Sequence, residues 1–361
     1  MLQGEGKKIL WWGRLGNYGP DYPRNRTVID CFEATGYKVV PFQPAISVLA
    51  DLEAALKNFQ DVVAVWVPCF RQRDVAAAAR WCRRNDVPLI FDPLISAFDK
   101  RVNERRKYPA DSWRGKRLLA WERKIFAQAD HVIADTQCHS EYFSELLGFP
   151  AAQISVIPVS AEEALFYPRN LPPNPQPEAL FFGTFIGLQG AQFIAQSLQH
   201  YNGSPFQLTF LGQGPDRVIC EEICKQCKNP LITVSFEDWI PFDKLPERIC
   251  RADLCLGVFG IGEKAARVIP NKVYQGLACG KTVLTMRGDA YPSSLQKHSL
   301  GIAWAEPGSP ESIAAAIADL FSPEKVADTQ SQTVPHETYM KHFSNDSIRQ
   351  TLGQLLGSFR A

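Results

Sequence analysis

The sequence has no long apolar run and no excess of charge of either sign. Lys and Arg number 39 and Asp and Glu 38, so the formal net charge over 361 residues is +1. A chain this close to neutral gives no electrostatic reason to expect a nucleic-acid partner. No apolar run reaches the roughly 20 residues of a membrane span, and the first residues lack the apolar core and cleavage site of a signal peptide. We therefore expect a cytoplasmic protein of two or three domains without a nucleic-acid partner.

The ten cysteines lack the setting in which disulfides form, because a long chain without a signal peptide is expected to keep its thiols reduced. Cys220, Cys224 and Cys227 have a C-x3-C-x2-C spacing that radical enzymes use for an iron–sulfur cluster. Here they lie at i, i+4 and i+7 of a helix predicted over 216–228, so they share one face. We expect a packed helix face; an iron–sulfur or zinc site is the alternative.

Short apolar segments alternate with helical segments through the first half of the chain. This alternation predicts a parallel, doubly wound α/β sheet. The predicted strands are 8–12, 37–42, 62–67, 88–91, 131–135 and 154–159. The predicted helices are 24–35, 48–59, 74–85, 116–129 and 140–147.

A proline-rich segment, PRNLPPNPQP at 168–177, separates the two halves. Its five prolines exclude a helix and a central strand, so we interpret 166–178 as a linker between domains. The alternation then restarts and predicts a second doubly wound domain. The predicted strands are 179–184, 207–211, 232–236, 253–258, 282–285 and 301–304. The predicted helices are 191–201, 216–228, 244–251, 271–279 and 310–321, followed by a final amphipathic helix over 343–356.

Glycines and cations gather where strands of the second half end. Gly183 lies at the end of one predicted strand and Gly212 follows the next, and glycine lets the backbone approach a ligand closely. Residues 252–286 predict a strand, a loop with Lys264 and Arg267, a helix and another strand. Ligands of open α/β sheets bind at the carboxyl ends of strands, and a helix N-terminus favours phosphate. The pattern therefore predicts a phosphate-binding edge; tight turns and a solvated loop are the alternative.

The order of these segments resembles the donor half of GT-B glycosyltransferases of family 4. The resemblance is carried by FFGTF at 181–185, FLGQGP at 210–215, VSFEDWIPFDKLPERICRADLCLGVF at 234–259 and IPNKVYQGLACGKTVLT at 269–285. It implies an α/β protein of the GT-B class, with two doubly wound Rossmann-like domains facing across a cleft. The implied parts are an N-terminal acceptor-binding domain (1–165), a nucleotide-sugar donor domain (179–335) and a C-terminal helix (336–361) that crosses back to the N-terminal domain.

Four positions depart from the family pattern. The family often has two phosphate-binding cations at the places of Thr184 and Gln189, and two glutamates at the places of Arg267 and Gln275. Gln275 retains the ability to hydrogen-bond a ribose hydroxyl. Arg267 is a different chemical group, suited to binding phosphate through two parallel hydrogen bonds.

Cations elsewhere are predicted to replace the missing pair. We expect Lys264, Arg267 and Lys272 to stabilise the leaving diphosphate as the glycosidic bond breaks, with solvated loop charges as the alternative. The resemblance also implies that Trp239 and Ile240 belong to the nucleobase-reading segment and that Gly16 approaches the donor. The complete predicted donor site is Gly16, Gly183, Thr184, Gln189, Gly212, Gly214, Trp239, Ile240, Lys264, Arg267, Asn271, Lys272 and Gln275.

On the acceptor side, Asp92 ends a predicted strand in LIFDPLISAFD. We predict it as a catalytic residue together with Arg267, orienting an acceptor hydroxyl or supporting charge on the sugar carbon. Capping of the following turn is the alternative. His139 follows the next strand, and we interpret it as a helix-start residue rather than a catalytic one.

The segment from Lys100 to Lys124 is strongly basic. It contains ten Lys and Arg against three Asp and Glu, a net charge of +7, with Trp113 and Trp121 interleaved. This composition predicts a surface for anionic lipid or for a lipid-linked diphosphate acceptor, with peripheral contact at the inner membrane face. The solvated face of a helix and loop is an equal alternative.

We therefore expect a glycosyltransferase that transfers a hexose from a nucleotide diphosphate sugar to a hydroxyl acceptor. The acceptor is expected to be a glycan or lipid-linked glycan in cell-surface polysaccharide biosynthesis, and neither a cofactor nor a metal is expected. Retention of configuration follows from the resemblance alone. One alternative is a non-catalytic GT-B protein that binds a nucleotide sugar or a partner, since the usual Arg, Lys and Glu residues are missing. The other is a nucleotide-sugar epimerase of the same architecture.

Overall fold

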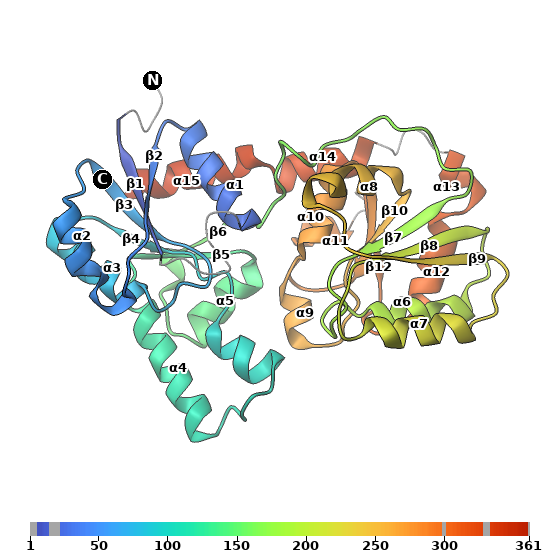
Figure 1. Cartoon of the computed structure of the whole chain (residues 1–361), viewed down its shortest axis with the longest axis horizontal. Helices are drawn as coiled ribbons and strands as arrows, with labels where there is room; N and C mark the ends of the chain where they lie inside the picture. Colours follow the sequence, from blue (N-terminus) through green and yellow to red (C-terminus); the bar gives the residue numbers. More distant parts are fainter. Residues whose placement is uncertain (1–5, 14–21, 298–300, 328–332, 360–361) are drawn as a thin grey trace. The chain divides into compact units, whose positions relative to one another are not determined.

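The structure is a computed structural model that describes residues 6–13, 22–297, 301–327 and 333–359 (Figure 1). The chain forms two compact units, one made of Met1–Val159 with Asn345–Ala361 and the other of Ser160–Ser344. Each unit is built on its own sheet of six parallel strands. The predicted α/β class with two doubly wound sheets is therefore confirmed.

The first sheet has the spatial order β2-β1-β3-β4-β5-β6 and the second has the order β12-β11-β10-β7-β8-β9. The strands of the first are β1 (Lys8–Trp12), β2 (Lys38–Phe42), β3 (Val62–Val67), β4 (Leu89–Phe91), β5 (His131–Ala134) and β6 (Ile154–Val156). The strands of the second are β7 (Glu178–Phe182), β8 (Phe206–Leu211), β9 (Ile232–Glu237), β10 (Leu254–Leu256), β11 (Thr282–Met286) and β12 (Ile302–Ala305).

Helices connect the strands and cover both faces of each sheet. Those of the first unit are α1 (Pro23–Ala34), η1 (Ser47–Leu49), α2 (Ala50–Lys57), α3 (Val75–Asn85), the π-helix η2 (Asp99–Glu104), α4 (Trp113–Phe126), α5 (Gln137–Glu145), η3 (Ala151–Gln153) and α15 (Asn345–Ser358). Those of the second are α6 (Ala191–Ser197), η4 (Leu198–His200), α7 (Arg217–Gln226), η5 (Phe242–Lys244), α8 (Leu245–Arg251), α9 (Glu263–Arg267), α10 (Asn271–Ala278), α11 (Ser293–Lys297), α12 (Pro310–Leu320), α13 (Pro323–Ala327) and α14 (Val334–His342).

Alternation along β1 shows how the first core is divided. Leu10 and Trp12 point to the face covered by α2, α3, α4 and α5, whereas Ile9 and Trp11 point to the face covered by α1 and α15. The predicted helix over 343–356 corresponds to α15. Because α15 lies beside α1, the last helix of the chain completes the core of the first sheet.

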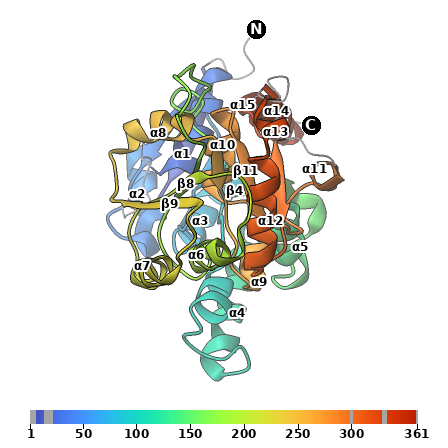
Figure 2. The ribbon, with the colours of Figure 1, turned by 90° about the vertical axis from the view of Figure 1, so that its right-hand side faces the viewer.

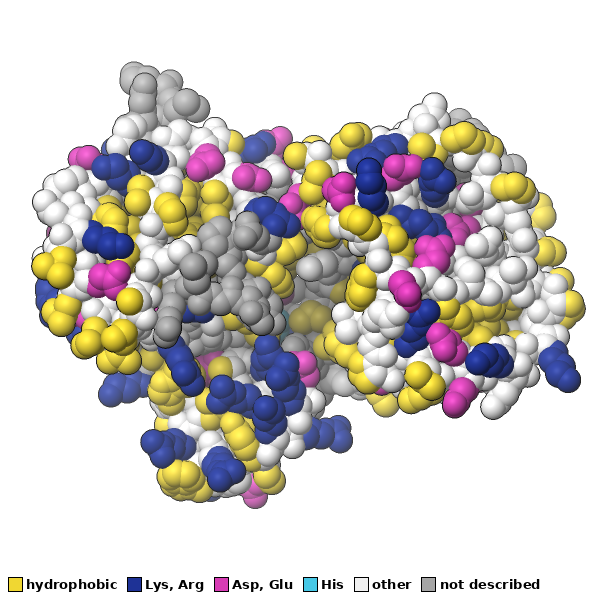
Figure 3. Space-filling view, in the orientation of Figure 1, with side chains coloured by type: hydrophobic (Ala, Val, Ile, Leu, Met, Phe, Trp, Pro, Cys, Tyr) yellow, Lys and Arg dark blue, Asp and Glu magenta, His cyan; other side chains and the backbone are white. Residues whose placement is uncertain are grey.

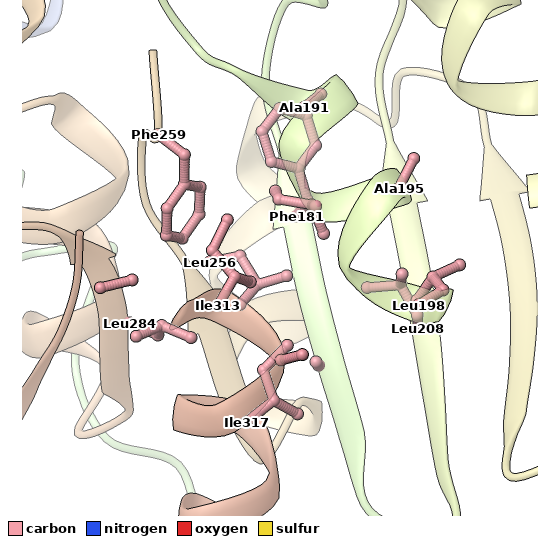
Figure 4. Close-up of a cluster of buried hydrophobic side chains, with 14 of the residues drawn as sticks. Phe181, Ala191, Ala195, Leu198, Leu208, Leu256, Phe259, Leu284, Ile313 and Ile317 are labelled. Carbon is pink, nitrogen blue, oxygen red and sulfur yellow. The ribbon is translucent and has the colours of Figure 1, made fainter. Parts of the chain in front are cut away.

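The second sheet is covered in the same two-sided way. Helices α6, α7 and α12 lie over one face and α8, α10 and α14 over the other (Figure 2). In the first of these layers, Phe181, Leu256 and Leu284 from three strands pack against Ile313 and Ile317 of α12 (Figure 4). This core fixes the strand ends from which the candidate site is built.

Cys220 and Cys224 lie on α7, whereas Cys227 directly follows the helix, which is two residues shorter at this end than predicted. All three belong to the second core, as the interpretation of a packed surface requires. Cys220 is fully buried in the second core, and Cys224 and Cys227 pack against it. Burial raises the pKa of Cys220 and of Cys224 to about 12, whereas metal-bound cysteines are thiolates. Among the described residues, no group of three or more His, Cys, Asp or Glu side chains is arranged to hold a metal ion.

One local prediction was wrong. The segment that contains Lys264 and Arg267 is the short helix α9, not a loop. Its sequence, EKAAR, consists of residues that favour helix, and the Gly262 carbonyl accepts a hydrogen bond from the Ala265 amide at 2.8 Å. Five residues are too few for a recognisable apolar period, so pattern reasoning missed this helix.

Candidate functional site

The carboxyl edge of the second sheet brings the predicted glycine turns together. The strand order reverses between β7 and β10, and open α/β sheets bind ligands in the crevice at such a switch point. Gly183 directly follows β7, and Gly212 directly follows the neighbouring β8. A side chain at Gly212, where φ is +130°, would collide with the Gly183 carbonyl. The two turns therefore touch through their backbones.

The space beside Gly183 is lined by two polar groups. A Cβ atom at this position would lie 3.1 Å from the Lys272 Nζ and 3.5 Å from the Gln189 Oε1. Gln189 comes from the loop after β7, whereas Lys272 is the second residue of α10, 83 residues further along the chain. The fold thus places an ammonium and an amide oxygen beside a residue that has no side chain.

Lys272 is the most unusual of these groups. Its side chain is buried, 5% exposed, and its Nζ lies 3.7 Å from the centroid of the Phe181 ring. The Nζ makes no hydrogen bond to any described residue, and the Gln189 Oε1 is also buried without a partner. Burial lowers the pKa of Lys272 well below its ordinary value. A buried ammonium without an anion is costly, so the site is suited to a ligand that brings negative charge.

Trp239 provides an aromatic surface at the same edge. Its Cη2 atom would lie 3.2 Å from a Cβ at Gly212, and half of the side chain is exposed. The neighbouring Ile240 is half-buried. The segment after β9 therefore lies directly beside the turn after β8.

Arg217, the first residue of α7, is a member of this edge that pattern reasoning missed. Its Nη1 donates to the Gly212 carbonyl at 2.8 Å and to the Asp238 carboxylate at 2.6 Å. Its Nε donates to Glu221, one helical turn away, at 2.9 Å. The Arg217 guanidinium therefore links the turn after β8 to Asp238, the residue before Trp239. The spacing of Arg217 and Glu221 was the only signal in the sequence.

The other predicted donor residues take varied positions. Thr184 and Asn271 are exposed, Gln275 is buried on α10, and Arg267 is half-buried at the end of α9. Gly214 packs against the backbone of Phe185. Gly16 and the side chain of Lys264 lie outside the described residues. Among the described members of the predicted cation set, Lys272 lies at the Gly183 turn.

Asp92 lies at the carboxyl end of β4, in the first unit, and its carboxylate forms a buried ion pair. Its Oδ2 accepts from the Arg24 Nε at 3.2 Å, and both side chains are fully buried. Arg24 also donates to the Pro158 carbonyl. Burial raises the pKa of Asp92, with Arg24 acting in the opposite direction. The carboxylate is therefore held by a partner 68 residues earlier in the chain.

His139 lies at the start of α5, and its partner Asp135 interacts electrostatically with both Arg24 and Asp92. Its backbone amide donates to the Oγ1 of Thr136, which caps the helix. Its ring is hydrogen-bonded to Asp135 and stacks on Phe143. These contacts agree with the interpretation of His139 as a helix-start residue.

Two doubly wound six-stranded parallel sheets in one chain, the second with glycine turns beside its switch point, are the architecture of the GT-B class of fold. Two family models match in succession, "Glycosyl transferase 4-like domain" over residues 18–160 and "Glycosyl transferases group 1" over residues 176–322. Together the two models cover most of the chain, which therefore consists of a glycosyl transferase 4-like domain followed by a glycosyl transferases group 1 domain, and the resemblance found in the sequence is confirmed. A search of curated proteins finds no match.

Solved structures with a similar fold are also glycosyltransferases. Anabaena HepE in complex with UDP is 14% identical, with a TM-score of 0.68, over 97% of this chain and 100% of that chain. Sucrose-phosphate synthase from Thermosynechococcus elongatus is 16% identical, with a TM-score of 0.67, over 98% of each chain. The lipopolysaccharide outer core galactosyltransferase WaaB is 15% identical, with a TM-score of 0.66, over 97% of this chain and 99% of that chain. At these identities the likeness shows the shared GT-B fold.

Proposed function

We propose that this glycosyltransferase moves a hexose from a nucleotide diphosphate sugar to a hydroxyl acceptor. The observation that carries the proposal is the buried Lys272 ammonium beside Gly183, which has no hydrogen-bond partner among the described residues. A diphosphate would supply the missing anion. HepE binds UDP and UDP-glucose, and WaaB is a galactosyltransferase; both support a UDP-hexose as the donor.

In this proposal the chain's own residues stabilise the leaving group. Negative charge develops on the diphosphate as the bond to the sugar breaks, and a cation already in place lowers the barrier without reorganising. Lys272 holds the diphosphate, with Arg267 and Lys264 as the other proposed cations. Gln275 is proposed to bind the ribose.

The first unit is proposed to supply the acceptor side. Asp92 remains the proposed catalytic carboxylate, and one of its oxygens is engaged by the Arg24 Nε at 3.2 Å. Retention of configuration, a glycan or lipid-linked acceptor, a role in surface polysaccharide synthesis and independence from metal rest on the resemblance. A cytoplasmic location at the inner membrane face is likewise a proposal.

The first experiment is a thermal-shift panel of UDP, GDP, ADP, dTDP and CMP. A ligand present at a hundred times its Kd adds about 2.7 kcal/mol of stability, so one diphosphate should give a clear response. Lys272→Met keeps the aliphatic stem over Phe181 and removes the charge; it should weaken that response by roughly tenfold in Kd. The control is Lys225→Met on α7, an exposed lysine that should leave the response unchanged. No responder, or equal affinity in Lys272→Met, would contradict the proposed donor site.

A second measurement separates the enzyme from a protein that only binds. The hexose donor of the responding nucleotide is incubated without acceptor, and products are followed by mass spectrometry. Slow release of free sugar and nucleotide diphosphate is expected of a transferase. Binding without turnover in the presence of candidate acceptors would favour the non-catalytic alternative, and an epimerised donor would favour the epimerase.

A further inference from the structure

The helix α2 and the turn before it expose apolar side chains and bury a charged one. Leu56 is 87% exposed and Val48 is 70% exposed, whereas the carboxylate of Asp51 is buried. In a surface helix of a globular protein the apolar stripe normally faces the core; here only the small Ala50 and Ala54 do so. The exposed set, called the α2 apolar face below, consists of Ile46, Val48, Leu49, Leu52 and Leu56.

This exposure is held in place by ion pairs. The Asp51 carboxylate accepts from Arg80 of α3 at 2.6 Å and from Arg84 at 2.9 Å. The Arg80 Nη2 also donates to the Val48 carbonyl at 2.6 Å. Hydrogen bonding to Arg80 lowers the pKa of Asp51, so the pair remains charged at neutral pH. The η1–α2 segment is thus fixed to α3 with its apolar face outward.

The same unit carries a dense cationic surface. Within residues 100–124, called the basic arm below, nine of the ten Lys and Arg side chains are exposed and Lys100 is half-buried. One of the three acids, Glu122, is buried and accepts hydrogen bonds from Ser96 and from the Phe98 amide, so it takes no part in the surface. Trp113 is 69% exposed, with the Arg117 guanidinium 5.1 Å from its ring. Figure 3 shows dark blue side chains gathered where Figure 1 places α4.

We propose that the α2 apolar face and the basic arm together form a docking surface for an anionic lipid bilayer. Leucines gain free energy by leaving water for the acyl boundary, and cations near the surface of an anionic leaflet are attracted to it. An exposed Trp is typical of the membrane interface. A nucleic acid would satisfy the cations but not the leucines, and a second copy of this chain would bury the leucines but bring cations together. No described helix is long and apolar enough to cross a membrane, and the proposed contact is peripheral.

The test is co-sedimentation of the full chain with two kinds of vesicle. One is pure phosphatidylcholine, and in the other about 30% of the lipid is phosphatidylglycerol, which is anionic. This binding does not require transferase activity, so it succeeds or fails independently of the proposed function. Wild type should bind the anionic vesicles at least about tenfold more tightly, and salt should weaken the binding. Leu52→Ser/Leu56→Ser and Lys116→Ala/Lys124→Ala should each reduce the partition coefficient by roughly tenfold.

Matched controls come from α7 and the residues that directly follow it in the second unit. Val218→Ser/Ile219→Ser removes two exposed apolar side chains, and Lys225→Ala/Lys228→Ala removes two exposed lysines; both should bind as wild type does. Unchanged melting temperatures would show that the variants fold. Equal binding to neutral and anionic vesicles, or equal losses in the controls, would overturn the proposal. A dimer in solution that Leu52→Ser/Leu56→Ser dissociates would assign the apolar face to a second copy instead.

Discussion

At Lys272 the burial of a single ammonium links pH to ligand binding. The pKa of the free protein's Lys272 lies well below its ordinary value of 10.5 because burial disfavours the charged form. A bound diphosphate favours the charged form and raises this pKa. Nucleotide affinity should therefore fall as the pH rises above the pKa of Lys272 in the free protein. Between that pKa and the higher pKa of Lys272 in the complex, binding should take up a proton. Calorimetric titration in two buffers of different ionisation enthalpy measures this uptake.

The free protein should respond to pH in the opposite direction. With its pKa lowered in the folded state, Lys272 binds fewer protons folded than unfolded, so its contribution to stability rises with pH up to 10.5. Lys272→Met should abolish both the proton uptake and this part of the pH dependence. Proton uptake that persists in Lys272→Met would assign the linkage to another group.

The pair of Arg24 and Asp92 allows a second prediction at this scale. Removing one partner of a fully buried ion pair leaves an uncompensated charge, so Arg24→Met should lower the free energy of unfolding by about 3–5 kcal/mol in urea titrations. Arg24→Met/Asp92→Leu should recover most of that loss, because both charges are gone.

A separate substitution tests whether Asp92 takes part in catalysis. If Asp92 takes part in chemistry, Asp92→Asn should lower the rate of donor turnover by at least about 10²-fold under conditions in which it remains folded. A variant that loses stability and keeps its turnover would reduce Asp92 to a structural partner of Arg24.

At the scale of single elements, strands were easier to predict than short helices. The strands are brief apolar runs bounded by turn residues, so their pattern is local. The π-helix η2 depends instead on Glu122, whose carboxylate accepts from the backbone amides of Ala97 and Phe98 just before it. The π-helix is therefore stabilised by a residue on α4, and no pattern in its own sequence indicates it.

The turn after β8 gives a prediction for Arg217. Because its guanidinium joins the Gly212 carbonyl to Asp238, Arg217→Ala should loosen the edge beside Trp239 and weaken nucleotide binding by roughly tenfold. Arg217→Lys should restore little, since an ammonium lacks the planar fork. Titration calorimetry with the responding nucleotide measures both.

The control for Arg217 is Arg251→Ala on α8. It removes an ion pair of the same i,i+4 spacing, with Glu247 at 2.7 Å, from an exposed helix surface. Equal losses of nucleotide affinity in the two variants would mean that loss of any ion pair on a helix has this effect. That result would contradict the positioning role of Arg217.

At the scale of the whole molecule, the two sheets and the glycine turns at the edge of the second could be predicted from the sequence, whereas contacts between distant side chains could not. Carboxyl ends of parallel strands meet at one edge, so Gly183 and Gly212 were expected to lie together. Lys272 was expected near them for the same reason. The partnership of Arg24 with Asp92 joins residues 68 positions apart through buried side chains, and that depends on packing rather than on pattern.

The division into two cores leads to the last prediction. The core of the first sheet includes Leu352 of α15, and that of the second includes Ile317 of α12. Truncating either side chain to Ala leaves a cavity and should cost about 2–5 kcal/mol. In calorimetric scans, Leu352→Ala should lower the transition of the first unit, whereas the nucleotide should raise only the transition of the unit that contains Lys272 and Ile317. Hydrogen exchange assigns each transition to its unit. If the nucleotide protected both units equally in the Leu352→Ala variant, the two cores would have to unfold as one.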